Sequence, residues 1–130
     1  MRFVLACLLT AAFGLTVLPD VARADPLVGN WGGGGTIKLT NGALEKVSCR
    51  VRYEDGGGKT FVLNATCATT AGTIKQSGRV VKRSGSRYTG RLYSEEYSVS
   101  GDVSVSVKGG SQTVRVSSPK GSGNLSLRRR

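Results

Sequence analysis

Two stretches of alternating side chains, each carrying one cysteine, most constrain how this chain folds. Apolar residues take every second position in 46–53, with charged or hydroxyl side chains between them, and in 60–67 apolar residues again take every second position, with Thr60, Val62, Asn64 and Thr66 between them. Asp55-Gly56-Gly57-Gly58 lies between the two stretches. A period of two is typical of a half-buried strand, and a run of glycines after an aspartate is a turn signal. We therefore expect an antiparallel hairpin with Cys49 opposite Cys67.

A Cys49–Cys67 disulfide would set the register of this hairpin. With the cysteines paired, Val51 lies opposite Ala65, so inward residues face one another. The chain has no histidine and no C-x-x-C spacing, so a metal site or a catalytic thiol would lack partners. Closing a loop of this length should stabilise the fold by about 3 kcal/mol in the chain-entropy model.

Residues 1–24 have the organisation of a secretory signal peptide. Arg2 precedes an uncharged, mostly apolar run over 3–18, and Ala22-Arg23-Ala24 supplies a small-residue cleavage site. The run is shorter than the roughly 20 residues that span a bilayer, which argues against a membrane anchor. We expect cleavage before Asp25, which removes Cys7 and leaves two cysteines in an oxidising compartment. The predicted mature chain, 25–130, is a single all-β domain without a transmembrane segment, periplasmic or secreted.

The remainder of the mature chain is typical of short strands joined by tight turns. Alternation is clearest over 99–108, and Gly109-Gly110 predicts a two-residue hairpin that pairs Val105 with Val114. Apolar residues of one parity mark further strands at 31–39, 73–82, 86–93, around 114–116 and at 124–127. Eight strands of this kind predict an antiparallel up-and-down meander that closes into a barrel. A two-layer β-sandwich is the alternative.

Parity also predicts how the first two strands pair and where they bend. A loop over 41–45 pairs Leu39 with Val47 and Ile37 with Cys49, so apolar residues again face one another. Glycines with inward parity favour a barrel, because strands need such points to coil tightly, or else they mark a hollow interior. These glycines are Gly33, Gly35, Gly78, Gly90 and Gly101.

Gly29-Asn30-Trp31, placed before the first strand of a meander, is similar to the G-x-W start of the lipocalin and avidin-type (calycin) barrels. In those families the tryptophan closes one end of the barrel, often under an arginine from a late strand. The resemblance implies that Trp31 is buried at a barrel end, while the outward parity of Arg128 leaves the arginine partner open. W-G-G-G-G, C-R-V-R-Y and the second cysteine also resemble small exported proteins of proteobacteria, which implies no particular chemistry.

The chain offers few groups for catalysis. Histidine is absent, and the pairs Glu54-Asp55 and Glu95-Glu96 are adjacent residues, which point to opposite faces of a strand. No predicted helix follows the glycines at 32–35, so they do not form the helix N-terminus that binds phosphate. We therefore expect a binding protein and not an enzyme, without catalytic residues, metal or cofactor.

The charge of the chain is strongly positive. It has 19 lysines and arginines against 8 carboxylates, a formal net charge of +11. Many of the cations have outward parity, and we single out Arg50, Arg52, Arg79 and Arg91 as candidate polyanion-binding residues. Their hairpin registers place only uncharged residues opposite them, namely Thr66, Asn64, Thr89 and Ser77 in the same order.

Two functions remain open at this point. Unpaired arginines suit polyanions, and for an exported protein these would be anionic glycans, lipopolysaccharide or lipid headgroups. Nucleic acid is disfavoured, because few aromatic residues have outward parity. The alternative is a small-ligand carrier that uses the barrel interior beneath Trp31, Tyr53 and Tyr88. The simplest interpretation of the same arginines is that they are scattered surface charges that keep the protein soluble.

Overall fold

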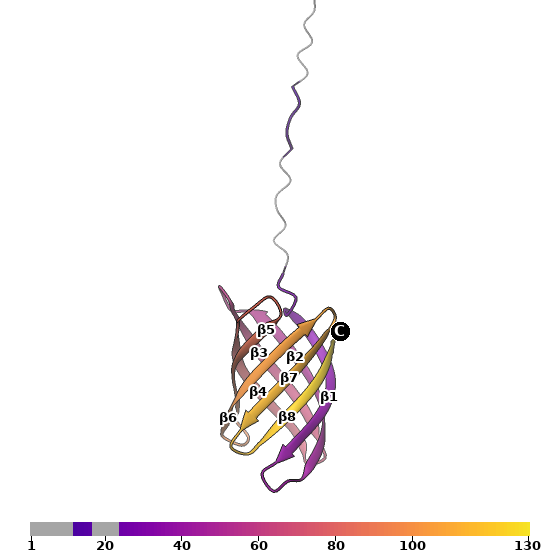
Figure 1. The fold of residues 1–130 in the computed structure, drawn as a ribbon, viewed down its shortest axis with the longest axis vertical. Helices are drawn as coiled ribbons and strands as arrows, with labels where there is room; N and C mark the ends of the chain where they lie inside the picture. The colour runs from indigo at the N-terminus through magenta and orange to yellow at the C-terminus, as the bar shows by residue number, and fades with distance from the viewer. Residues whose placement is uncertain (1–11, 17–23) are drawn as a thin grey trace, which may run out of the picture.

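The computed structural model describes residues 12–16 and 24–130, so most of the predicted signal peptide lies outside the described residues. The strands are β1 (Gly29–Leu39), β2 (Leu44–Asp55), β3 (Thr60–Thr69), β4 (Gly72–Lys82), β5 (Arg87–Ser94), β6 (Val99–Lys108), β7 (Ser111–Ser118) and β8 (Gly121–Arg129). Each strand pairs antiparallel with the next, and β8 pairs with β1, so the sheet closes into a barrel (Figure 1). This confirms the predicted meander and barrel over the sandwich. None of the described residues forms a helix able to cross a membrane.

The two hairpins with the strongest local signals have the predicted register. Cys49 pairs with Cys67 on β2 and β3, and the two are disulfide-bonded with Cα atoms 4.1 Å apart. Val105 pairs with Val114 across the Gly109-Gly110 turn between β6 and β7. In both hairpins, inward side chains face one another, as the alternation requires.

The predicted pairing of β1 with β2 is wrong by four residues. Ile37 pairs with Glu45 and Gly33 with Cys49. The connection is shorter than predicted, because the Leu39 N–H donates to the Ala43 carbonyl at 2.9 Å. Asn41 also accepts a hydrogen bond from the Ala43 N–H through its side chain, again at 2.9 Å. A shift by an even number of residues preserves parity, so the inward residues remain inward.

The predicted pairing of β4 with β5 is also wrong, by two residues. Arg79 faces Arg91 directly, and neither faces the predicted Thr89 or Ser77. The Arg83 N–H donates to the Arg87 carbonyl at 2.8 Å, so the turn is longer than the predicted Arg83-Ser84-Gly85. Two like charges therefore stand opposite each other, which is mildly unfavourable in a sheet.

The inward glycines allow the strands to approach very closely. A Cβ on Gly35 would lie 1.8 Å from the Asn124 carbonyl oxygen, and a Cβ on Gly90 would lie 1.8 Å from the Arg79 carbonyl oxygen. Gly33 and Gly78 have similar contacts, at 2.2 and 2.0 Å from a neighbouring carbonyl. At these four positions the backbone of the next strand occupies the space of a side chain, so the glycines coil the sheet.

The two ends of the barrel differ in how they are filled. At the closed end lie residues 24–28 and the connections β2–β3, β4–β5 and β6–β7, and the chain reaches the barrel there (Figure 1). Inward apolar side chains of this half are fully buried, among them Trp31, Tyr53, Leu63, Val80, Tyr88 and Leu127. At the open end, with the other four connections, inward apolar residues are half-buried: Ile37, Ile74, Val99, Val116 and Leu125.

Candidate functional site

A cavity of about 490 Å³ lies inside the barrel and opens at the open end. Every strand contributes to its wall, because inward positions alternate along all eight. Apolar side chains dominate the wall: Ile37, Leu39, Val47, Ile74, Leu92, Val99, Val116 and Leu125. The Cys49–Cys67 disulfide also lines it. Such a cavity is within the range of roughly 300–1,000 Å³ of small-molecule sites.

Of the glycines that line the cavity, Gly123 widens this half of the barrel. A Cβ on Gly101 or Gly121 would lie 2.7 or 2.5 Å from a carbonyl oxygen of the next strand, so those two are close strand contacts. A Cβ on Gly123 would make ordinary contact with Ile37, 3.6 Å from Cγ1. The space in front of Gly123 is therefore real volume and not a close strand contact.

Polar side chains gather toward the mouth. Gln76, Ser94 and Thr69 line the wall, and Glu45 and Lys120 stand on connections or strand ends at the rim. Glu45 accepts a hydrogen bond from the Thr70 hydroxyl at 3.4 Å. Tyr97, in the β5–β6 connection, also lines the mouth and is 54% exposed. The cavity thus offers an apolar interior and a polar entrance.

Trp31 sits at the closed end and is 1% exposed. Its Nε1–H donates to the Leu27 carbonyl at 2.9 Å, and Leu27 is itself fully buried beside it. The Arg129 guanidinium lies 4.6 Å from the ring centroid and donates to the carbonyls of Pro26 and Val28. Arg129, and not Arg128, is therefore the late-strand arginine over the tryptophan. The sequence already indicated that Arg129 points inward, because it shares the parity of Leu125 and Leu127.

Tyr53 and Tyr88 fill the closed half and line no part of the cavity. The Tyr53 hydroxyl donates to Gln112 Oε1 at 2.7 Å, and burial raises the pKa of Tyr53. Tyr88 packs edge-on against Phe61, with ring centroids 5.6 Å apart. The interior beneath these tyrosines is a packed core, so a ligand space lies in the other half of the barrel. Gln112, a buried amide, gave no signal in the sequence beyond its inward parity.

Asp25 holds the start of the described barrel segment against the closed end. Its carboxylate contacts the Lys82 ammonium at 2.6 Å, accepts a hydrogen bond from the Tyr88 hydroxyl and accepts one from the Leu27 N–H at 3.0 Å. Partial burial acts to raise the pKa of Asp25, but these bonds from Lys82, Tyr88 and Leu27 together hold that pKa below its ordinary value of 3.8. Burial and the Asp25 charge both raise the pKa of Tyr88.

Asp25→Asn is expected to lower the free energy of unfolding at neutral pH by about 1.5–3 kcal/mol, the usual contribution of a hydrogen bond to a charged group. Because the folded-state pKa of Asp25 is depressed, its contribution is complete above the unfolded pKa and disappears as pH falls through the folded value. Urea unfolding of both proteins from pH 7 to pH 2 should therefore show a constant difference that shrinks below pH 3.8. A difference independent of pH would contradict this role.

The four predicted polyanion-binding arginines lie on the outer face but do not form one cluster. Arg50 and Arg52 are on β2, and β3 separates them from Arg79 and Arg91 on β4 and β5. Arg52 contacts Glu54 at 2.8 Å and Arg91 contacts Asp102 at 2.8 Å. The expectation that these arginines are unpaired is therefore wrong for Arg52 and Arg91. Exposed ion pairs of this kind contribute little to stability.

The comparisons with known proteins show the fold alone. Neither the scan against protein-family models nor the search of curated proteins finds a match. The redesigned barrel mFAP1 bound to DFHBI matches with a TM-score of 0.67 and 13% identity, over 81% of this chain and 95% of that one. A de novo designed fluorescence-activating β-barrel matches at 0.63 and 16%, over 83% and 100%. Rv2717c from M. tuberculosis matches at 0.56 and 13%, over 81% and 93%.

Proposed function

We propose that this protein binds a small, largely apolar molecule in the open-end cavity and acts as its carrier, by binding and not by catalysis. The observation that carries the proposal is the contrast between the halves of one barrel. The closed half is packed to near-complete burial, whereas the open half has half-buried inward apolar side chains around about 490 Å³ of space. Apolar surface left open to solvent in a folded interior is a typical ligand-binding feature.

The lining determines the kind of ligand. The body of the ligand would contact aliphatic side chains and the disulfide, so an apolar ligand gains affinity when its surface leaves water. A polar group at one end would lie near the mouth, where Glu45 and Lys120 present opposite charges and Gln76 and Ser94 offer hydrogen bonds. A compact ring system or a short chain with one polar end meets these requirements.

Two further observations support the proposal. The mFAP1 structure is of a β-barrel with a similar fold and is bound to DFHBI, so a barrel with a similar fold can hold such a ligand. The Cys49–Cys67 disulfide is of the type that persists in oxidising compartments, which favours a periplasmic or secreted carrier.

Gly123→Phe is the variant that tests the cavity most directly. The ring would enter the space between Ile37 and Val116, which pair with Gly123 on either side, and the new Cβ would make only ordinary contacts. We expect affinity for N-phenyl-1-naphthylamine, an uncharged fluorescent probe, to fall about tenfold or more, because the phenyl ring occupies part of the space that the probe needs. Fluorescence titration measures this, with the thermal midpoint as a check of folding.

Gly85→Phe is the matched control, because a Cβ at Gly85 meets nothing within 4 Å and the residue lies in the β4–β5 connection at the closed end. It should leave probe binding unchanged. Equal binding by the wild type and Gly123→Phe, with both proteins folded, would contradict the proposal. If Gly123→Phe weakens binding as expected, mass spectrometry of molecules that co-purify with the natively produced protein would identify the natural ligand.

A further inference from the structure

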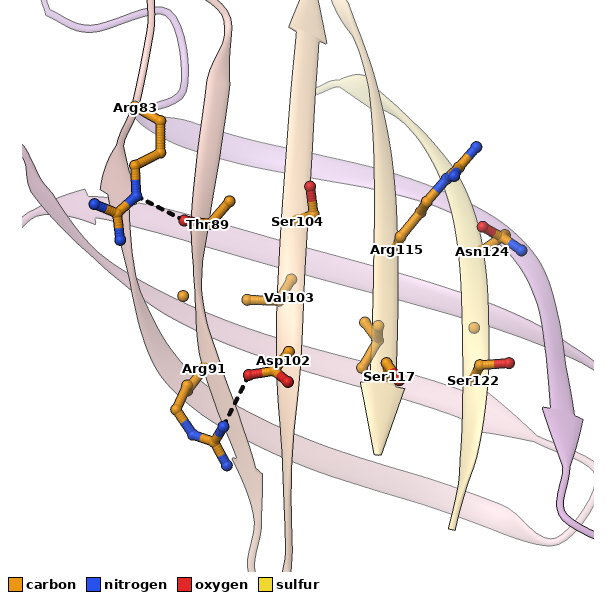
Figure 2. Close-up of a pocket in the computed structure, with 13 residues that line it drawn as sticks. Arg83, Thr89, Arg91, Asp102, Val103, Ser104, Arg115, Ser117, Ser122 and Asn124 are labelled. Carbon is orange, nitrogen blue, oxygen red and sulfur yellow. Dashed lines mark hydrogen bonds and ion pairs between the residues drawn. The ribbon is translucent and has the colours of Figure 1, made fainter. Parts of the chain in front are cut away.

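A groove of about 710 Å³ crosses the outer face of the barrel over β5, β6, β7 and β8 (Figure 2). The outside of a barrel is ordinarily convex, and here it is hollowed because the outward residues of the floor are short. Ser104 pairs with Thr89 on one side and with Arg115 on the other, and Asp102 pairs with Ser117. The longer side chains of Arg83, Arg91 and Arg115 stand around this floor.

Two of these arginines are held in place by neighbours. Arg83 Nε donates to the Thr89 hydroxyl at 2.8 Å, and Arg91 Nη1 donates to Asp102 Oδ1 at 2.8 Å (Figure 2). Within residues 12–16 and 24–130, Arg115 makes no ion pair. Asp102 is the one carboxylate among the groove residues, so three cations face one anion. The groove is therefore positive and presents guanidinium N–H groups whose direction is partly set.

We propose that this groove binds an anionic sugar polymer. Guanidinium groups bond carboxylate, sulfate or phosphate with two parallel N–H donors, which an ammonium cannot do. The serine, threonine and asparagine side chains of the floor both donate and accept hydrogen bonds, as sugar hydroxyls require. Arg91 and Arg115 lie on strands separated by β6, which spaces their backbones by about 10 Å and suits charges on a repeating chain.

The shape and lining favour a glycan over a membrane surface. The concave floor admits a narrow chain, and the exposed large apolar side chains of the barrel, Leu44, Tyr93 and Tyr97, lie outside the groove. The groove lies on the outer side of the barrel wall and the cavity on the inner side, and Val116, Ser122 and Gly123 of that wall border both. Of the arginines expected from the sequence to bind polyanions, this groove contains Arg91.

The test compares two double variants that lose the same charge. Arg83→Gln with Arg115→Gln removes two groove cations and leaves the Arg91–Asp102 pair intact. Arg50→Gln with Arg128→Gln removes two exposed arginines that flank Gly32 across β1, on strand positions outside the groove. Binding of the full chain to polygalacturonate, a carboxylated sugar polymer, is measured by calorimetry at low salt, with neutral dextran and phosphatidylglycerol vesicles as comparison probes.

We expect the groove variant to bind polygalacturonate about tenfold or more weakly, because bidentate bonds between arginine and carboxylate are among the stronger hydrogen bonds. The control variant should bind no more than about threefold more weakly, as expected for general screening of a distant charge. Dextran should not bind, and wild-type binding should weaken as salt rises. Equal losses in both variants, no binding to polygalacturonate, or tighter binding to the vesicles would each overturn the proposal.

Discussion

Replacing Trp31 by alanine is expected to lower the free energy of unfolding by about 3–5 kcal/mol, as for other large buried aromatic residues. The side chain is 1% exposed and seals the closed end above a packed core. Its loss opens a cavity, leaves the Leu27 carbonyl without its donor and removes the ring beneath the Arg129 guanidinium. Urea unfolding followed by circular dichroism measures the change, because the variant has no other tryptophan to report fluorescence.

Trp31→Phe provides the comparison that separates packing from hydrogen bonding. It keeps an aromatic ring in the closed end and removes the Nε1–H donor to Leu27. Its cost should be clearly smaller than that of alanine, and it gives a measurable value even if the alanine variant fails to fold. In the wild type, the emission maximum should lie to the blue of a solvated indole and move to the red on unfolding. A stability loss below about 1 kcal/mol for alanine would contradict this role.

Gly90→Ala is expected to cost about 3 kcal/mol or more, at the upper end of overpacking effects. The added Cβ would lie 1.8 Å from the Arg79 carbonyl oxygen, which belongs to the backbone of the adjacent strand. A flexible side chain could move aside, whereas β4 can do so only by separating from β5 and weakening the hydrogen bonds between them. Denaturant unfolding measures the loss.

Gly110→Ala is the matched control for this effect. Gly110 lies in the β6–β7 turn, has no positive φ, and a Cβ there meets nothing within 4 Å. Alanine at such a position restricts the unfolded chain and should change stability by less than about 1 kcal/mol, in the stabilising direction. A similar destabilisation by both substitutions would show that Gly90 is not a point of close strand contact.

The registers show how far local patterns reach. The cysteines fix β2 against β3, and Gly109-Gly110 fixes β6 against β7, because each signal joins two specific residues. No such signal joins β1 to β2, where β1 offers glycines in place of inward side chains. Nor does one join β4 to β5, where a shift of two residues leaves every inward residue inward. Periodicity cannot detect an even shift, and the backbone bonds that close each turn decide it.

For the candidate sites, too, the sequence indicated which face a residue is on but not which residues of other strands lie beside it. Parity alone placed Trp31 inward, and it would also have placed Arg129 inward above it. The outward parity of Arg91 was correct, but its pairing with Asp102 joins β5 to β6 across a connection that carries no register signal in the sequence. The cavity could not be predicted, because its walls come from every strand and inward residues look the same in the packed half and the open half.

The sequence by itself determined the strands, the face to which each side chain points and the disulfide, because these depend on neighbours in the chain or on one covalent bond. Tertiary structure alone decided between the barrel and the sandwich, which glycines touch the next strand, where the interior is empty and where short outward residues hollow the outer wall. The physical reason is that a period of two specifies a face but not a height along the barrel. Height depends on how strands from the whole chain stagger, and so do the volumes left between their side chains.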